Sequence, residues 1–345
     1  MERIKQNDTF DVLKVIMAMM ITIIHIITLR KLGVIGSFIF PILRTAVPVF
    51  FMISSYLFFS KINIIKSYTE QKKYLFKAIK RNLQLYLSWF IILIPITFYV
   101  KDYFKSGILK GILLLIWNFL SGDTFIASWF IVALIIGLFI VFYLTKRFSN
   151  RIVFICSLLV YILCILTSNY GNLASMSAIR GILTWWLPYN SFTAGLVWII
   201  AGKLFADNRD IFYFGPVRQN WIILLTICLL YLEQIGILYL GSSYANDCYF
   251  MLVPLCFLLF ASILRVHLTS NNAKQLRVFS TITYCLHASL AKIPALLLLM
   301  LGLPKDTFPM SIIKWIITII GCVCVTLIVN KIERFKRFKW IKYLH

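Results

Sequence analysis

Acidic residues, histidines and patterned cysteines are all scarce in this chain. Its 345 residues include 12 Asp and Glu and 4 His, against 35 Lys and Arg. The 8 cysteines are scattered without a CxxC pair, and Cys322-Val323-Cys324 is too tightly spaced for a zinc site. The sequence has no cluster of carboxylates, and no histidine has a carboxylate or another histidine near it, so we expect no bound metal. Repeats are not apparent, nor is a cleavable signal peptide, because Lys14 and His25 interrupt the first apolar run.

Apolar residues, in contrast, make up 61% of the chain, charged residues only 14%, and the mean hydropathy is +0.88. A soluble fold of this size cannot bury that much apolar surface. The composition therefore predicts an all-α, polytopic integral membrane protein in contact with membrane lipids. The net charge of +23 does not indicate a nucleic-acid partner, because the basic residues gather at the ends of apolar runs and form no stripe.

The apolar runs predict about ten transmembrane helices in a single domain covering residues 1–345. The expected spans are about 10–29, 38–59, 83–100, 128–145, 151–168, 187–205, 221–240, 248–265, 278–302 and 310–330. The shorter run 108–120 is expected as an interfacial or re-entrant helix. With the N-terminus inside, Lys and Arg concentrate in the loops on the cytoplasmic side, which predicts both termini in the cytoplasm.

Four basic residues fall inside the expected spans: Lys14, Arg44, Lys292 and Lys314. An ionisable group at membrane depth is a functional hypothesis, because placing it there is costly. Lys14 and His25 are about three helical turns apart, so they share one face of the first span, separated by about 16 Å along its axis. Arg44 is expected in a neighbouring span at a depth similar to that of His25. We expect Lys14, His25 and Arg44 to line one polar path.

Five short motifs follow one another along the chain. They are Asp11-Val12-Leu13-Lys14 with His25 after ten further residues, the segment from Arg44 to Phe58, Lys77-Ala78-Ile79-Lys80 with Arg81, Trp129-Phe130 with Leu134, and Thr283-Tyr284-Cys285-Leu286-His287. In these motifs the chain resembles the acyltransferase 3 family of integral membrane O-acyltransferases. Among its members the chain is most similar to the compact type typified by the enterobacterial common antigen O-acetyltransferase. Ser55 stands where this family usually has Gly, and Lys14, Lys77 and Lys80 replace usual arginines, which keeps the charge but loses the bidentate fork.

The resemblance implies an enzyme of the bacterial cytoplasmic membrane that acts without a bound cofactor. It would move an acyl group, foremost an acetyl group, from cytoplasmic acyl-CoA such as acetyl-CoA to a hydroxyl of a cell-surface or lipid-linked carbohydrate. Such a transfer needs a base for the acceptor proton and a cation near the thioester oxygen. We assign His25 as general base or as transient acyl carrier, against a structural hydrogen-bonding role. Arg44 would stabilise the oxyanion or orient donor phosphate, or else tie two helices together.

The loop expected at 60–82 is rich in Lys and Arg, with Glu70 as its one acid. We interpret Lys77, Lys80 and Arg81 as donor-binding residues, because acyl-CoA presents several phosphates to the cytoplasm. Membrane topology and anionic lipid explain the rest of this charge.

Trp129, Glu233 and His287 are candidate cavity-lining residues. Glu233 and His287 would pair with an intramembrane cation or serve in packing, and Trp129 would anchor or line the cavity. Two other functions stay open at this point. One is transport or polysaccharide export without acyl transfer, and the other is amino-acid uptake, which some relatives combine with a fused racemase.

Overall fold

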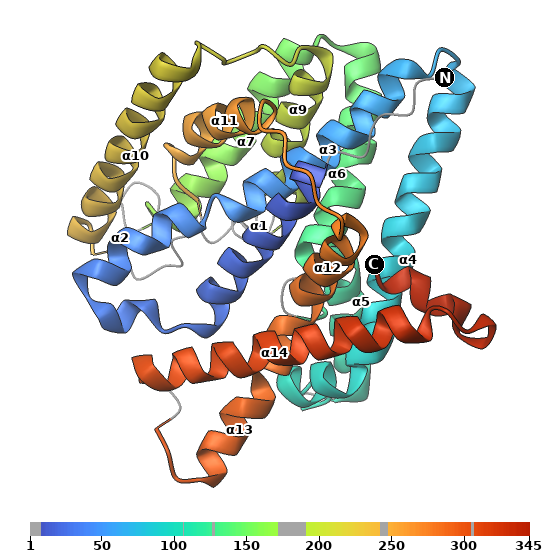
Figure 1. The fold of residues 1–345 in the computed structure, drawn as a ribbon, viewed down its shortest axis with the longest axis vertical. Helices are drawn as coiled ribbons and strands as arrows, with labels where there is room; N and C mark the ends of the chain where they lie inside the picture. Colours follow the sequence, from blue (N-terminus) through green and yellow to red (C-terminus); the bar gives the residue numbers. More distant parts are fainter. Residues whose placement is uncertain (1–7, 106, 126–127, 172–190, 242–247, 305–306) are drawn as a thin grey trace. The chain divides into compact units, whose positions relative to one another are not determined.

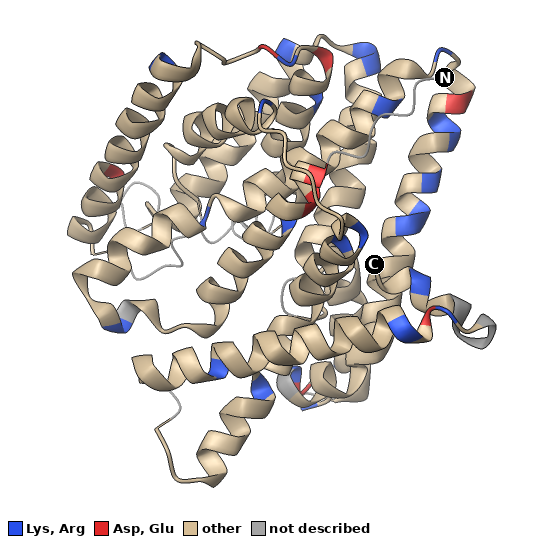
Figure 2. Ribbon diagram, viewed as in Figure 1, with Lys and Arg blue, Asp and Glu red and all other residues tan. Residues whose placement is uncertain are grey.

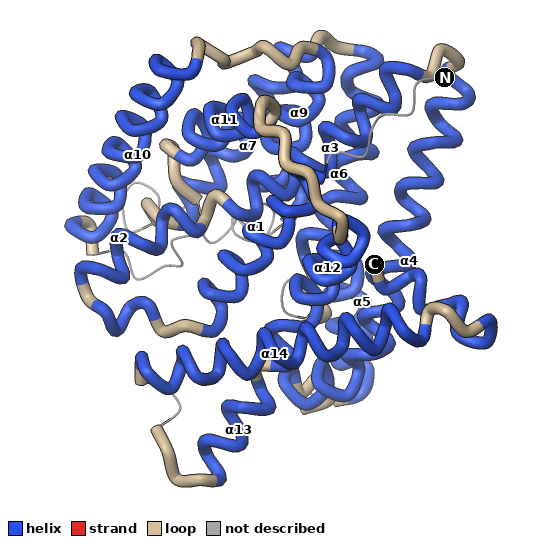
Figure 3. Tube along the Cα trace, in the orientation of Figure 1, coloured by secondary structure: helices blue, strands red, loops and turns tan. Residues whose placement is uncertain are grey.

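The computed structural model describes residues 8–105, 107–125, 128–171, 191–241, 248–304 and 307–345, and these form helices and no strand (Figures 1 and 3). The elements are α1 (Asp8–Ile26), η1 (Leu29–Leu32), α2 (Val34–Leu43), α3 (Ala46–Ile64), α4 (Tyr68–Lys101), α5 (Ile108–Ser121), α6 (Trp129–Arg147), α7 (Asn150–Ser168), α9 (Phe192–Asp207), α10 (Pro216–Tyr239), α11 (Leu252–Ile263), α12 (Ala273–Leu290), α13 (Lys292–Met300), α14 (Phe308–Ile332) and η2 (Lys336–Leu344). The all-α prediction is confirmed for these residues.

Eight helical segments of the described chain are long and apolar enough to cross a membrane. Two of them join shorter helices, α2 with α3 and α12 with α13. The predicted span at 248–265 corresponds to α11, whose 12 residues cover only about 18 Å of a hydrocarbon core about 30 Å thick. The predicted span at 187–205 begins outside the described residues and continues as α9. The chain is therefore a polytopic helical membrane protein, and the count of ten spans stays a prediction.

Two segments between the expected spans are helical. The run at 108–120 forms the 14-residue helix α5, about 21 Å long, as expected for a segment too short to cross. The prediction of a loop at 60–82 is wrong, because α3 continues to Ile64 and α4 begins at Tyr68. Lys and Arg are good helix formers, so a basic segment between two apolar helices continues the helix.

The chain divides into two compact units. The first comprises Met1–Gly36, Ala78–Val132 and His267–His345, and the second comprises Ser37–Lys77 and Ala133–Val266. In the first unit α1 packs against α12 and α14. In the second unit α3 packs against α9, and α9 also packs against α7.

A glycine permits the close approach of α9 to α3. A methyl group on Gly202 would lie 2.0 Å from the Ser55 hydroxyl and 2.6 Å from the backbone oxygen of Met52. Ser55 is fully buried, and its hydroxyl donates to the Phe51 carbonyl at 2.8 Å. The serine that replaces the usual glycine on α3 is thus accommodated by a glycine on α9.

Candidate active site

Helices α1 and α12 lie side by side in the first unit (Figure 1). Near their beginnings, the guanidinium of Arg277 donates to both carboxylate oxygens of Asp11, at 3.0 and 2.6 Å. Near their ends, the imidazole rings of His25 and His287 lie with their centroids 5.3 Å apart and their planes at 36°. Because the two contacts occur in the same order along both helices, α1 and α12 are parallel.

Helix α14 runs in the opposite direction along α1. The indole of Trp315 donates to the Thr22 hydroxyl at 2.8 Å, and the backbone N–H of Thr28 donates to the Ser311 hydroxyl at 3.2 Å. Later residues of α1 and its extension therefore meet earlier residues of α14. The predicted first, ninth and tenth spans correspond to α1, α12 and α14. The predicted topology requires α1 and α12 to be parallel and α14 to be antiparallel to them, as these contacts place them.

His287 is fully buried and has a fixed tautomer. Its Nδ1 lies 2.9 Å from the carbonyl oxygens of both Thr283 and Tyr284. Both oxygens only accept hydrogen bonds, so Nδ1 carries the proton and Nε2 presents a lone pair. This Nε2 has no hydrogen-bond partner among the described residues. His25, in contrast, has an exposed side chain.

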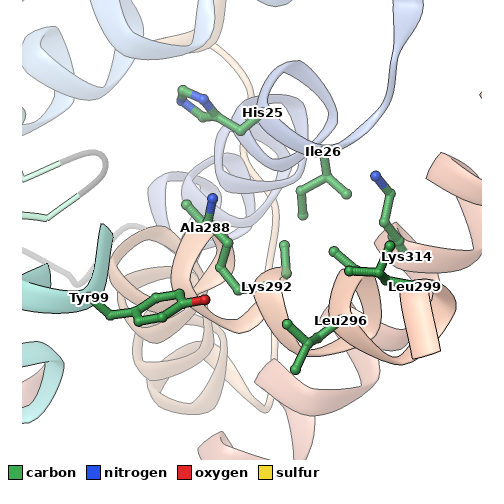
Figure 4. A pocket seen from close by; sticks show the side chains of 10 residues that line it. His25, Ile26, Tyr99, Ala288, Lys292, Leu296, Leu299 and Lys314 are labelled. Carbon is green, nitrogen blue, oxygen red and sulfur yellow. The ribbon is translucent and has the colours of Figure 1, made fainter. Parts of the chain in front are cut away.

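A cavity of about 360 Å³ opens beside His25 at the C-terminal end of α1 (Figure 4). Its polar lining comes from four elements of the first unit: His25 on α1, Tyr99 on α4, Lys292 on α13 and Lys314 on α14. Aliphatic side chains complete the wall. Of the residues that sequence analysis placed in the reaction path, His25 lines this cavity.

Positive charge gathers at the opposite end of α1. Lys14 is half-buried there and lies within electrostatic reach of Asp11, Arg277 and Arg81. Since Arg277 is paired with Asp11, Lys14 and Arg81 leave a net positive charge at this end of the helix. The structure thus brings together two predicted residues, Lys14 and Arg81, from separate motifs.

The three predicted donor-binding residues share one helix. Lys77, Lys80 and Arg81 have exposed side chains on α4, along which Figure 2 shows several basic positions. Spacings of three and four residues place them on one face. Lys80 and Arg81 belong to the first unit and Lys77 to the second.

Two other predicted site residues lie in the second unit. Arg44 is half-buried between α2 and α3, and its guanidinium lies over the Phe40 ring, 4.4 Å from its centroid. The carboxylate of Glu233 accepts hydrogen bonds from the backbone N–H groups of Phe250 and Met251, at 2.7 and 2.9 Å. These contacts give Glu233 a role in holding the start of α11. The predicted place of Arg44 beside His25 stays a prediction.

Trp129, the first residue of α6, is half-buried. Its neighbour Phe130 packs edge-to-face on Tyr284 of α12, with centroids 5.4 Å apart. Tyr284 also supplies one of the carbonyls that hold His287. The Trp129-Phe130 motif therefore supports the helix that carries the second histidine.

Sequence analysis missed Arg277 and Tyr99. Arg277 lies one residue before the expected span 278–302, among the basic residues that the predicted topology places in the cytoplasm, although Asp11 inside an apolar run indicates the need for a partner. Nothing in the sequence around Tyr99 distinguishes it from the many other aromatic residues of the chain.

A comparison with protein families identifies the chain. The model of the acyltransferase 3 family, described as an acyltransferase domain, matches residues 7–331. The chain belongs to the acyltransferase 3 family. Together with the apolar helices, this match supports a membrane acyltransferase. The finer similarity to the enterobacterial common antigen type stays a prediction.

Two curated relatives of this acyltransferase 3 protein carry other names. An "Amino-acid racemase" of Enterococcus faecalis is 26% identical over 281 residues, covering 78% of this chain and 37% of the relative. A "Serine/alanine racemase" of Enterococcus gallinarum is 32% identical over 125 residues, covering 33% of this chain and 18% of the relative. The chain thus spans well under half the length of either relative. No solved structure matches the chain.

Proposed function

We propose that the protein is an O-acyltransferase that moves an acyl group, foremost an acetyl group, from acyl-CoA to a hydroxyl of a cell-surface or lipid-linked carbohydrate. One observation carries this proposal: Lys14 of α1 and Arg81 of α4 lie near the beginning of α1, and the imidazole of His25 lies near its end. Lys14 and His25 are separated by about 16 Å along the helix axis. Acyl-CoA has the matching arrangement, because its phosphates lie at one end of an extended molecule and its thioester at the other.

In the proposed reaction His25 acts as general base. It takes the proton of the acceptor hydroxyl while the oxygen attacks the thioester carbonyl. The carbon–sulfur bond then breaks, the thiolate of CoA leaves and takes up a proton, and the acyl ester remains on the acceptor. A two-step route fits the same residues. An imidazole nitrogen of His25 attacks the thioester carbonyl and the thiolate of CoA leaves; the acceptor hydroxyl then attacks the acyl-imidazole, its proton is released, and the imidazole is regenerated.

His287 supports this chemistry as a positioning residue. Its buried ring lies against His25, and its Nδ1 is held by two carbonyls of its own helix. A fixed neighbour restricts the orientations that the His25 ring adopts, and a preorganised base loses less entropy in the transition state.

The proposed location is the bacterial cytoplasmic membrane, with both termini in the cytoplasm and ten spans. Accessibility tags at both ends test the orientation. A cysteine label at Ser243, which lies outside the described residues, tests the outer loop that the ten-span topology predicts.

The competing proposal is polysaccharide export or transport without acyl transfer. Release of CoA thiol separates the two proposals. Purified protein in lipid nanodiscs is supplied with acetyl-CoA and a carbohydrate acceptor, and thiol formation is followed together with ester on the acceptor. Acceptor-dependent release of one thiol per ester formed supports the enzyme, whereas uptake into vesicles without thiol release favours the transporter.

A further inference from the structure

The cavity beside His25 carries two ammonium groups that lack a counter-ion in the described part of the chain. Lys314 on α14 is buried, with 8% of its surface exposed, and Lys292 begins α13. No hydrogen bond or ion pair joins either ammonium to another described residue. The described carboxylates of the first unit that form ion pairs bind other cations: Asp11 binds Arg277, Asp123 binds Lys101 and Glu333 binds Lys274.

A buried ammonium without a counter-ion is costly in an apolar helix bundle. Lysines near the end of a membrane helix often extend the ammonium toward the interface, which explains the exposed Lys292. This explanation does not extend to Lys314, whose side chain is enclosed by protein. An anion bound in the cavity would offset this cost for Lys314, and Lys292 would supply a second ammonium to the same anion.

The rest of the cavity is suited to a small organic molecule. Its volume of about 360 Å³ falls within the range of ligand sites, roughly 300–1,000 Å³. Ile26, Leu296 and Leu299 supply apolar wall, and the Tyr99 hydroxyl supplies a hydrogen-bonding group (Figure 4). The cavity lies at the end of α1 remote from Lys14 and Arg81, so the phosphates of a donor would not compete for its two lysines.

We infer that this cavity is the acceptor subsite and that Lys292 and Lys314 bind a carboxylate or phosphate group carried by the acceptor. Binding of this group presents a hydroxyl of the same molecule to His25. The inference rests on the proposed function and adds the substrate class: the acceptor is an anionic sugar derivative.

Equilibrium binding to the purified full chain tests the inference without turnover. In nanodiscs of phosphatidylcholine, 4-nitrophenyl β-glucuronide and 4-nitrophenyl β-glucoside 6-phosphate are compared with neutral 4-nitrophenyl β-glucoside, which has the same ring and aglycone. We expect the anionic probes to bind at least about tenfold more tightly. Lys314→Gln and Lys292→Gln should each weaken the anionic probes by about tenfold and leave the neutral probe within about twofold, whereas Lys314→Arg and the exposed control Lys105→Gln should retain the preference.

Equal binding of charged and neutral probes overturns the inference, and so does a preference that survives Lys292→Gln combined with Lys314→Gln. If Lys314→Gln does not fold, the exposed Lys292→Gln variant carries the test. A repeat in nanodiscs containing phosphatidylglycerol separates acceptor from lipid: loss of the preference there assigns the lysines to lipid phosphate and overturns the acceptor subsite. CoA release is measured separately, so that the two proposals can fail independently. Anion binding without turnover contradicts only the proposed function. Turnover with equal KM for all three acceptors contradicts only the inference.

Discussion

The rings of His25 and His287 lie 5.3 Å apart, yet one is exposed and the other is completely buried. The buried ring is fixed by two carbonyls, so its proton stays on Nδ1. The exposed ring faces a cavity. This asymmetry supports the proposed roles of His25 as the reacting histidine and His287 as the positioning histidine.

Replacement of His287 should separate these roles. His287→Phe keeps the ring volume but loses the Nδ1–H, and we expect kcat to fall by about tenfold or more while the KM for acyl-CoA stays within about twofold. The pH dependence of kcat should also shift, because the ring next to the base has changed. His287→Asn, which keeps a hydrogen-bond donor, should recover part of the rate. Equal pH profiles for wild type and His287→Phe would reduce His287 to a packing residue.

The cations at the beginning of α1 should govern use of the donor. Lys14→Gln and Arg81→Gln should each raise the KM for acyl-CoA several-fold, and the effect should shrink at high salt, because phosphate attraction is electrostatic. The triple variant that combines Lys77→Gln, Lys80→Gln and Arg81→Gln should raise the KM for acyl-CoA further. Lys14→Arg should keep or improve activity, since it supplies a bidentate donor.

Lys110→Gln on α5 is the matched control for these variants, because its side chain is exposed and distant in sequence from every proposed site residue. Steady-state kinetics with acyl-CoA as the varied substrate provides the measurement. A donor KM that is the same in wild type and in the variants would remove this cluster from the donor site.

Gly202→Ala should destabilise the second unit. The added methyl group would meet the Met52 carbonyl at 2.6 Å, and backbone cannot move away at low cost. Overpacking of this kind costs about 1–3 kcal/mol. Thermal unfolding should show a lower Tm, and Ser55→Gly should not restore it, because the contact with Met52 remains. Gly236→Ala on α10 is the control, since a methyl group there would meet no neighbouring atom within 4 Å. Equal Tm values for the two variants would contradict the predicted clash.

The C-terminal histidine should make stability depend on pH. Burial lowers the pKa of His345 below its ordinary value of 6.5, although Glu333, 3.6 Å away, opposes the shift. As the pH falls through 6.5, the unfolded chain takes up a proton that the folded chain resists, so stability is lost toward lower pH. Tm measured from pH 7.5 to 5 should therefore fall more steeply for wild type than for His345→Gln. Parallel curves would show that His345 does not contribute.

The sequence predicted the helices better than the contacts between them. Apolar runs locate most helices, because burial in lipid imposes length and composition on every span. The common face of Lys14 and His25 follows from helix periodicity alone, and both residues lie on α1. The pairing of His25 with His287 and of Asp11 with Arg277 depends on which helices pack together, and single-sequence periodicity does not determine that.

Other errors have local causes. The segment 60–82 was expected as a loop because charge interrupts its hydropathy, but charged residues do not interrupt a helix outside the hydrocarbon core. Glu233 was considered as a partner for an intramembrane cation, and its described partners are backbone N–H groups and Tyr170 instead. A count of charges along a sequence does not register the backbone donors that a fold brings to a carboxylate.

The rate of acyl transfer by His25→Ala tests the account most directly. The variant should insert and unfold like wild type, because loss of one exposed imidazole leaves the apolar character of α1 intact. Transfer measured by thiol release and acceptor ester formation should fall by about 10²–10⁴ if His25 is a general base, and by more if it carries the acyl group. Full activity in this variant would contradict the proposed reaction and leave transport as the better account of the protein.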